Sequence, residues 1–171
     1  RWSGAVPEPS RAFRTCSCTS VFNVLWPEPG RTFASAPAVA EGGVGLISRV
    51  PHASDTLSGR ITRETVFPPE DHRSHRNKDN MLDNFDKAET LRFLSSAETG
   101  RTMGQAAIAG ILAHREFACV LPTVLSVDEV REYAAASDLP LTVDEAGAVE
   151  DLRPRTFAHV DRSTVPLKSR V

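Results

Sequence analysis

The apolar residues of this chain fall first into short, nearly uninterrupted runs. VFNVL at residues 21–25, VGLIS at 44–48 and FACVL at 117–121 are each followed within three residues by a proline. Short apolar runs that stop at a turn residue are typical of strands buried on both faces. The pattern therefore predicts three short buried strands.

After residue 80 the spacing of the apolar residues becomes helical. Three segments, TMGQ at 102–105, SVDE at 126–129 and TVDE at 142–145, have the form of a capping box. They predict helices over about 102–114, 126–136 and 142–152, and FASAPAVAE at 33–41 predicts a short helix before the second strand. A further apolar stripe at helical spacing consists of Leu82, Phe85, Ala88, Leu91 and Leu94.

The alternation of strands and helices indicates an α/β fold with a parallel sheet and right-handed crossovers. Ligands of such folds bind at the carboxyl ends of the strands. Here those ends are residues 49–59 and 122–126, so we expect the two loops to build one site. The polar span of residues 49–80 is long for a loop, and loops of that length are usually functional or disordered.

Composition narrows the class of protein. With 171 residues, of which 40% are apolar, the chain can form one domain with a packed core. A net charge of −2 lacks the basic excess of a nucleic-acid-binding protein, and no apolar run approaches the roughly 20 residues that span a bilayer. Three cysteines, Cys16, Cys18 and Cys119, form no disulfide framework and predict reduced thiols in the cytoplasm.

The two ends of the chain show no periodicity. We expect residues 1–20 to be an irregular leader, residues 21–152 to be the folded domain and residues 153–171 to be an irregular tail.

Three polar clusters could carry chemistry. Donors around the glycine-closed loop of residues 49–60 suit a phosphate or pyrophosphate, although an ordinary solvated loop has the same composition. Residues 123–126 precede a helix amino terminus, which favours an anion. In DHRSHR, His72 and His75 have the spacing of zinc ligands, but the neighbouring Arg73 and Arg76 oppose a cation, so we expect loop-ordering ion pairs and no metal.

Three passages together resemble the carboxyl-terminal half of the aldo-keto reductases, which are (β/α)8 barrels that reduce carbonyls with NADPH. VFNVL looks like the sixth barrel strand, and GVGLISRVPHASDTLSGR at 43–60 looks like the seventh strand with its cofactor loop. Residues 101–152 look like the seventh helix, the eighth strand and the eighth helix. The resemblance implies a partial (β/α)8 TIM barrel made of carboxyl-terminal strands and helices only.

The resemblance also implies a set of cofactor-binding residues. The loop over the pyrophosphate corresponds to Arg49, Pro51, His52, Ser54, Leu57, Gly59 and Arg60, and the adenosine side corresponds to Pro122, Thr123, Ser126, Glu129 and Tyr133. NADP is the expected cofactor. NAD is the alternative, because no cation stands near Leu125 and the Glu129 carboxylate would repel a 2′-phosphate or accept from a ribose 2′-hydroxyl.

No catalytic residue is assigned. The family takes its catalytic Asp, Tyr, Lys and His from the early strands, and a complete barrel needs roughly 250 residues. Tyr133 falls in a predicted helix on the wrong side of the site. We therefore expect NAD(P)H-dependent reduction of a small aldehyde or ketone in the full-length form only, and self-association of this chain through exposed barrel edges. The alternatives are a small non-enzymatic α/β module that binds a nucleotide or a protein, and a non-functional truncated gene product.

Overall fold

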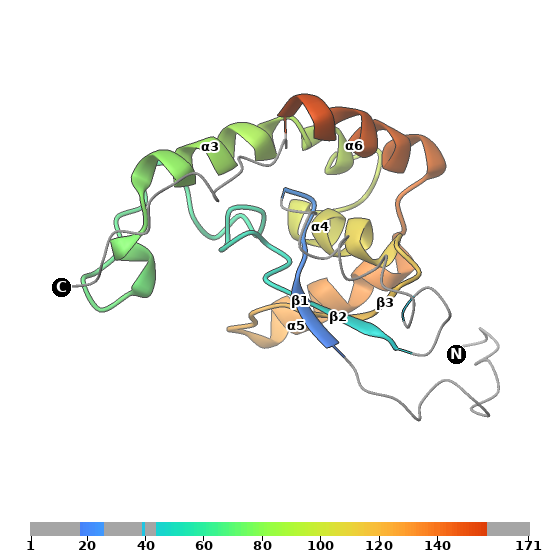
Figure 1. Ribbon diagram of the computed structural model, residues 1–171, viewed down its shortest axis with the longest axis horizontal. Coiled ribbons are helices and arrows are strands. Elements are labelled where there is room, and N and C mark those ends of the chain that lie inside the picture. Colours follow the sequence, from blue (N-terminus) through green and yellow to red (C-terminus); the bar gives the residue numbers. More distant parts are fainter. Residues whose placement is uncertain (1–17, 26–38, 40–43, 157–171) are drawn as a thin grey trace.

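A computed structural model of the chain describes residues 18–25, 39 and 44–156. Its strands β1 (Cys18–Val21), β2 (Leu46–Arg49) and β3 (Phe117–Leu121) form one sheet in the order β1-β2-β3, and both neighbouring pairs are parallel. Val21 lies beside Arg49, and Arg49 lies beside Leu121, so the three carboxyl ends are level. The predicted parallel sheet is confirmed (Figure 1).

The first strand differs from its prediction. β1 ends at Val21, because the Asn23 side chain turns the chain there: its Oδ1 accepts from Leu25 N at 3.0 Å and its Nδ2 donates to Val50 O at 3.0 Å. Phe22, Val24 and Leu25 follow the strand and are buried. The run VFNVL therefore predicted core residues correctly, but only its first residue, Val21, lies in the strand. The short helix predicted at 33–41 lies outside the described residues, apart from the buried Val39.

The helices behind the sheet begin where the capping boxes place them. α4 (Met103–Leu112) and α6 (Val143–Thr156) have complete boxes, and α6 continues past residue 152 into the predicted tail. α5 (Val127–Ala135) has half of its box: the Ser126 hydroxyl accepts from Glu129 N at 3.2 Å, but the Glu129 carboxylate accepts from Leu125 N at 2.6 Å. The hydrogen bond from Leu125 N fixes the Glu129 carboxylate at the start of α5.

The predicted stripe at 82–94 forms two elements. Helix α3 (Lys78–Glu89) ends at its cap Thr90, and the stripe continues in the 3-10 turn η2 (Arg92–Leu94). A second 3-10 turn, η1 (His72–His75), interrupts the span predicted to be irregular, and a third, η3 (Ala136–Asp138), follows α5.

The core lies between the sheet and these helices. One cluster of apolar side chains joins α4 to the segment that follows β1, to the loop after β2 and to η2. Apolar residues of α3 and α6 pack against this cluster. In Figure 1, α3 and α6 run along the top, and α4 lies between them and the strands. The buried Arg101 side chain ties this side together by donating to Leu94 O at 3.2 Å and Pro140 O at 2.7 Å and by pairing with Glu145.

Among the described residues, no helix has both the length and the apolar character needed to cross a membrane.

Candidate functional site

Two loops meet at the carboxyl edge of the sheet. The 50–60 loop follows β2, and the 122–133 segment follows β3 and includes most of α5. Arg60 spans them: its Nη2 donates to Asp55 Oδ1 at 2.5 Å and to Thr123 O at 3.4 Å, and its Nη1 lies 3.5 Å from Glu129 Oε1. The sequence placed both segments at one site, and these contacts show that they adjoin.

The 50–60 loop has an unusual backbone. Four of its residues that are not glycine have a positive φ, namely Val50 at 61°, Ala53 at 48°, Ser54 at 62° and Asp55 at 74°. This conformation is uncommon for residues with a side chain and costs about 1–3 kcal/mol at each position. Such strain persists only where the surroundings enforce it, and it concentrates at functional sites.

The loop's own side chains and main chain enforce that conformation. The Thr56 hydroxyl donates to Ala53 O at 3.0 Å, the Ser58 hydroxyl donates to Asp55 O at 2.9 Å, and Leu57 N donates to His52 O at 3.1 Å. Sequence analysis missed the run of positive φ values, because glycine, its usual sign, occurs only at Gly59, where φ is 78°.

His52 anchors the loop to the helices. Its Nε2 lies 3.2 Å from Gly104 O at the start of α4, and its ring lies 4.6 Å from the Tyr133 ring of α5. Burial lowers the pKa of His52, so the imidazole is neutral at pH 7 and Nε2 carries the proton that it donates to Gly104 O. Burial raises the pKa of Tyr133, whose ring packs against His52 and is 5% exposed.

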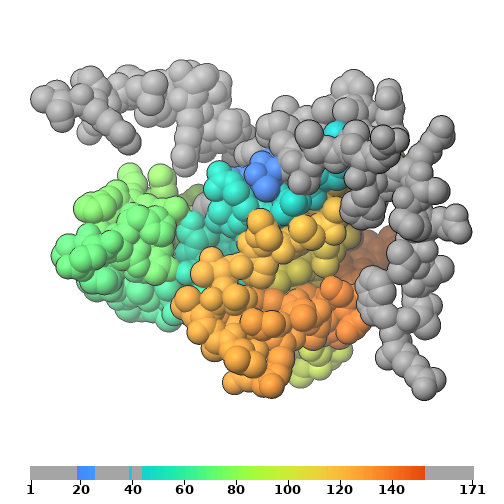
Figure 2. Space-filling view, turned by 90° about the horizontal axis from the view of Figure 1, so that it is seen from below, coloured from blue at the N-terminus to red at the C-terminus, as the bar shows by residue number. Residues whose placement is uncertain are grey.

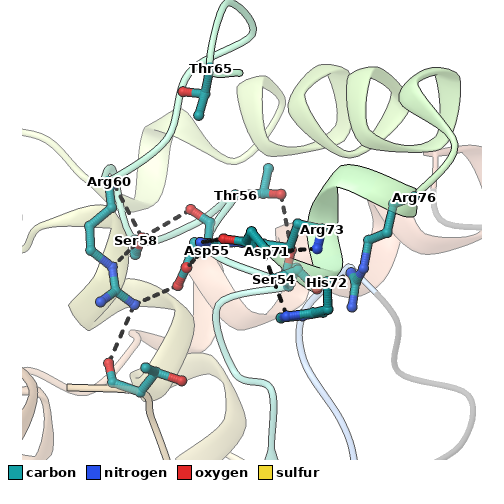
Figure 3. Close-up of polar contacts among 12 residues, drawn as sticks. Ser54, Asp55, Thr56, Ser58, Arg60, Thr65, Asp71, His72, Arg73 and Arg76 are labelled. Carbon is teal, nitrogen blue, oxygen red and sulfur yellow. Dashed lines mark hydrogen bonds and ion pairs between the residues drawn. The ribbon is translucent and has the colours of Figure 1, made fainter. Parts of the chain in front are cut away.

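Two further arginines reach the loop, Arg73 from η1 and Arg76 from the cap that follows η1. Arg73 Nη1 donates to Asp55 Oδ2 at 2.5 Å, and Arg76 Nη1 donates to the Ser54 hydroxyl (Figure 3). Both carboxylate oxygens of Asp71 accept hydrogen bonds from the Arg73 guanidinium, and these bonds lower the pKa of Asp71 to about 2. The expected loop-ordering ion pairs at DHRSHR are therefore present, and the described residues contain no cluster fit for a metal ion.

Only some of the predicted cofactor residues contact one another in the structure. It joins Arg60 to Thr123 and Glu129, and it places His52 against Tyr133. It uses the others differently: Pro51 and Leu57 are buried supports, Ser54 accepts from Arg76, Ser126 caps α5, Pro122 is half-buried, and Arg49 and Gly59 are exposed. Asp55 and Arg73, which the sequence did not assign to the cofactor, are joined to Arg60, and Arg76 donates to Ser54.

Comparisons with known proteins decide the family. The family model described as Aldo/keto reductase family matches residues 22–154. This chain belongs to the aldo-keto reductases. No match to a curated protein is found for its sequence.

Solved aldo-keto reductases share the fold. The aldo-keto reductase AKR11C1 from Bacillus halodurans, in its apo form, is 25% identical with a TM-score of 0.55, over 80% of this chain and 42% of that protein. The glycerol dehydrogenase AKR11B4 from Gluconobacter oxydans is 18% identical with a TM-score of 0.60, over 85% of this chain and 44% of that protein. This aldo-keto reductase chain thus spans about two fifths of the structures it matches, and the predicted partial barrel is confirmed.

Proposed function

We propose that this aldo-keto reductase chain binds a nicotinamide dinucleotide, with the phosphates on the 50–60 loop and the adenosine beside the 122–133 segment. The observation that carries the proposal is Arg60, which joins both segments at the carboxyl edge of a parallel sheet. Ligand sites of such sheets lie at this edge.

The residues present fit a phosphate group. Arg60 Nη1 is buried and makes no hydrogen bond to any described residue, since Glu129 at 3.5 Å offers only a looser ion pair. A guanidinium with a spare donor suits phosphate oxygens, which it binds through two parallel N–H groups. A buried donor of this kind is costly unless an acceptor reaches it.

The choice between the two nicotinamide cofactors rests on opposing features. The family resemblance favours NADP. The Glu129 carboxylate faces the site, however, and Arg131, the basic residue of the 122–133 segment, is exposed and pairs with Asp128 at 3.0 Å. A carboxylate that faces the site disfavours a 2′-phosphate and suits a ribose hydroxyl. Both cofactors therefore belong in the test.

The chemistry follows from the cofactor. When bound, a reduced nicotinamide supplies a hydride to the carbonyl carbon of an aldehyde or ketone. The chain's own residues hold the dinucleotide: Arg60 takes phosphate charge, and the neutral His52 and the buried Leu57 keep the loop in its strained form. Carbonyl reduction itself is proposed for the full barrel, since no described residue is assigned as the proton donor.

Titration of the full chain with NADP+ and NAD+ tests the proposal. We expect Arg60→Gln to weaken binding about tenfold, because a hydrogen bond to a charged group is worth roughly 1.5–3 kcal/mol. Arg63→Gln is the matched control, because Arg63 is exposed and pairs with Asp86, away from the site. Calorimetry gives the affinities, and thermal melts confirm that both variants fold.

Two results would count against the proposal. Absence of binding of either dinucleotide at millimolar concentration would remove it. Binding no tighter than that of ADP would instead favour the small nucleotide-binding module, because the nicotinamide half would then contribute nothing.

A further inference from the structure

One carboxylate sits between two arginines of the candidate site. Asp55 Oδ1 accepts from Arg60 Nη2 at 2.5 Å, and Asp55 Oδ2 accepts from Arg73 Nη1 at 2.5 Å (Figure 3). The side chains of Arg60 and Arg73 are only 19% and 23% exposed, so water screens these pairs less than it would at an open surface. Asp55 thus bridges an arginine of the loop after β2 and an arginine of η1.

This arrangement resembles the way in which arginines hold a phosphate. Carboxylates and phosphates compete for the same guanidinium N–H groups, because both offer paired oxygens in the same geometry. Arg60 pairs with Asp55 and Glu129, and Arg73 pairs with Asp55 and Asp71, so carboxylates already neutralise both arginines. An incoming anion reaches Arg60 Nη2 and Arg73 Nη1 only where Asp55 gives way, whereas Arg60 Nη1 already lacks a hydrogen bond to the described residues.

Asp55 is the carboxylate placed to give way. It lies in the positive-φ run, with φ at 74°, so its position is held by its contacts against a backbone preference. Asp71, in contrast, is held by three hydrogen bonds from the Arg73 guanidinium and also caps η1 by accepting from Arg73 N at 2.8 Å. Glu129 is fixed by Leu125 N at 2.6 Å.

We propose that Asp55 is an internal counter-anion, which a ligand bearing a phosphoanhydride replaces at Arg60 and Arg73. The proposal deepens the proposed function and rests on it for the location of the ligand's phosphates. Asp55 then lowers the affinity for the ligand and joins the η1 segment to the loop while the site holds no phosphate. Arg73 of η1 becomes part of the anion site, a role that the sequence did not assign to it.

Asp55→Asn tests the proposal directly. Asparagine has the same shape and tolerates a positive φ, so the substitution removes the charge and keeps the backbone. We expect inorganic pyrophosphate and ADP to bind the variant about tenfold more tightly than they bind the parent chain, a gain of about 1.4 kcal/mol. Isothermal titration of the full chain measures it.

The matched control is Asp86→Asn. Asp86 also pairs with an arginine, Arg63 at 2.7 Å, but its side chain is 70% exposed and lies outside the site. Its loss changes the net charge equally and is expected to leave pyrophosphate affinity unchanged. Adding Arg73→Gln to Asp55→Asn is expected to abolish the gain, because the gain depends on the freed arginine. If Asp55→Asn melts below the assay temperature, Asp55→Gly replaces it, since glycine also accepts a positive φ.

The outcomes separate this proposal from the proposed function. Equal or weaker pyrophosphate binding by Asp55→Asn overturns the counter-anion. If NADP+ and NAD+ bind the parent chain well and Asp55→Asn adds nothing, the dinucleotide site stands and the counter-anion fails. If Asp55→Asn gains affinity for pyrophosphate while neither dinucleotide binds better than pyrophosphate does, the counter-anion stands and the dinucleotide function fails.

Discussion

His52 links the candidate site to the stability of the fold. It is 3% exposed, and its imidazole lies between the Gly104 carbonyl and the Tyr133 ring. Because burial lowers its pKa from the usual 6.5, the unfolded chain takes up a proton at a higher pH than the folded chain does. His52 therefore contributes stability above pH 6.5, and this contribution is lost progressively as the pH falls below that value.

The corresponding variant is His52→Gln, which offers an amide N–H to Gly104 O and does not titrate. We expect the melting temperature of the parent chain to fall between pH 7.5 and pH 5.5 and that of His52→Gln to fall less. This window lies well above the pKa of about 2 of Asp71, so that carboxylate does not titrate within it. His72→Gln is the control, because the His72 side chain is 78% exposed. An equal fall in all three proteins would show that His52 is not the titrating group.

At the scale of elements, α4 owes its position to small residues. Its sequence MGQAAIAGIL is buried from Gly104 to Ile111, and its small residues let the helix approach the segment that follows β1 closely. A Cβ atom added at Gly110 would lie 2.7 Å from Val24 Cγ1, closer than real contacts allow. A Cβ atom added at Gly147 in α6 would meet nothing within 4 Å.

These two glycines form a matched pair of substitutions. We expect Gly110→Ala to destabilise the chain by about 1–3 kcal/mol, because the methyl group must displace Val24 or shift the helix. Gly147→Ala is expected to stabilise it by about 0.5–1 kcal/mol, because alanine is the better helix former. Urea unfolding measures both. A Gly110→Ala variant that is as stable as the parent chain would contradict the close packing of α4 on residue 24.

At the scale of the molecule, β3 is an edge strand of the sheet among the described residues. Within the described residues, β3 pairs with β2 alone, and the apolar side chains beyond it are exposed, with Leu121 at 52%, Val124 at 43%, Leu125 at 76%, Val127 at 65% and Val130 at 51%. An apolar groove of about 430 Å³ lies between α4, β3 and α5. In Figure 2, the segment that contains β3 and α5 is coloured orange and lies at the front of the view.

We propose that a second copy of the chain covers this patch, which consists of the five residues just named. Exposed strand edges and apolar patches favour association. Val130→Lys on α5 is expected to shift the chain toward monomer in sedimentation experiments, whereas Val143→Lys, at an 88% exposed position of α6, is not. A parent chain that stays monomeric at every concentration would remove the prediction, as would a Val130→Lys variant that associates equally.

The sequence alone determined the features that depend on neighbours along the chain. A capping box is complete within four residues, so TMGQ and TVDE fixed where α4 and α6 begin. Buried strands need uninterrupted apolar runs, so β2 and β3 and the two loops after them were found, and the loops' shared edge followed from the parallel sheet. The first strand failed because Asn23 turns the chain through a bond to Val50, 27 residues away.

Only the tertiary structure decided how the site is assembled. Asp55 meets Arg73 across 18 residues, and Arg60 meets Thr123 across 63. The positive φ values at residues 53–55 are held by hydrogen bonds within the loop and occur without glycine, so the usual sequence sign of this conformation is missing. Side-chain charges can be read from a sequence, but which of them neutralise one another depends on distances that folding alone sets.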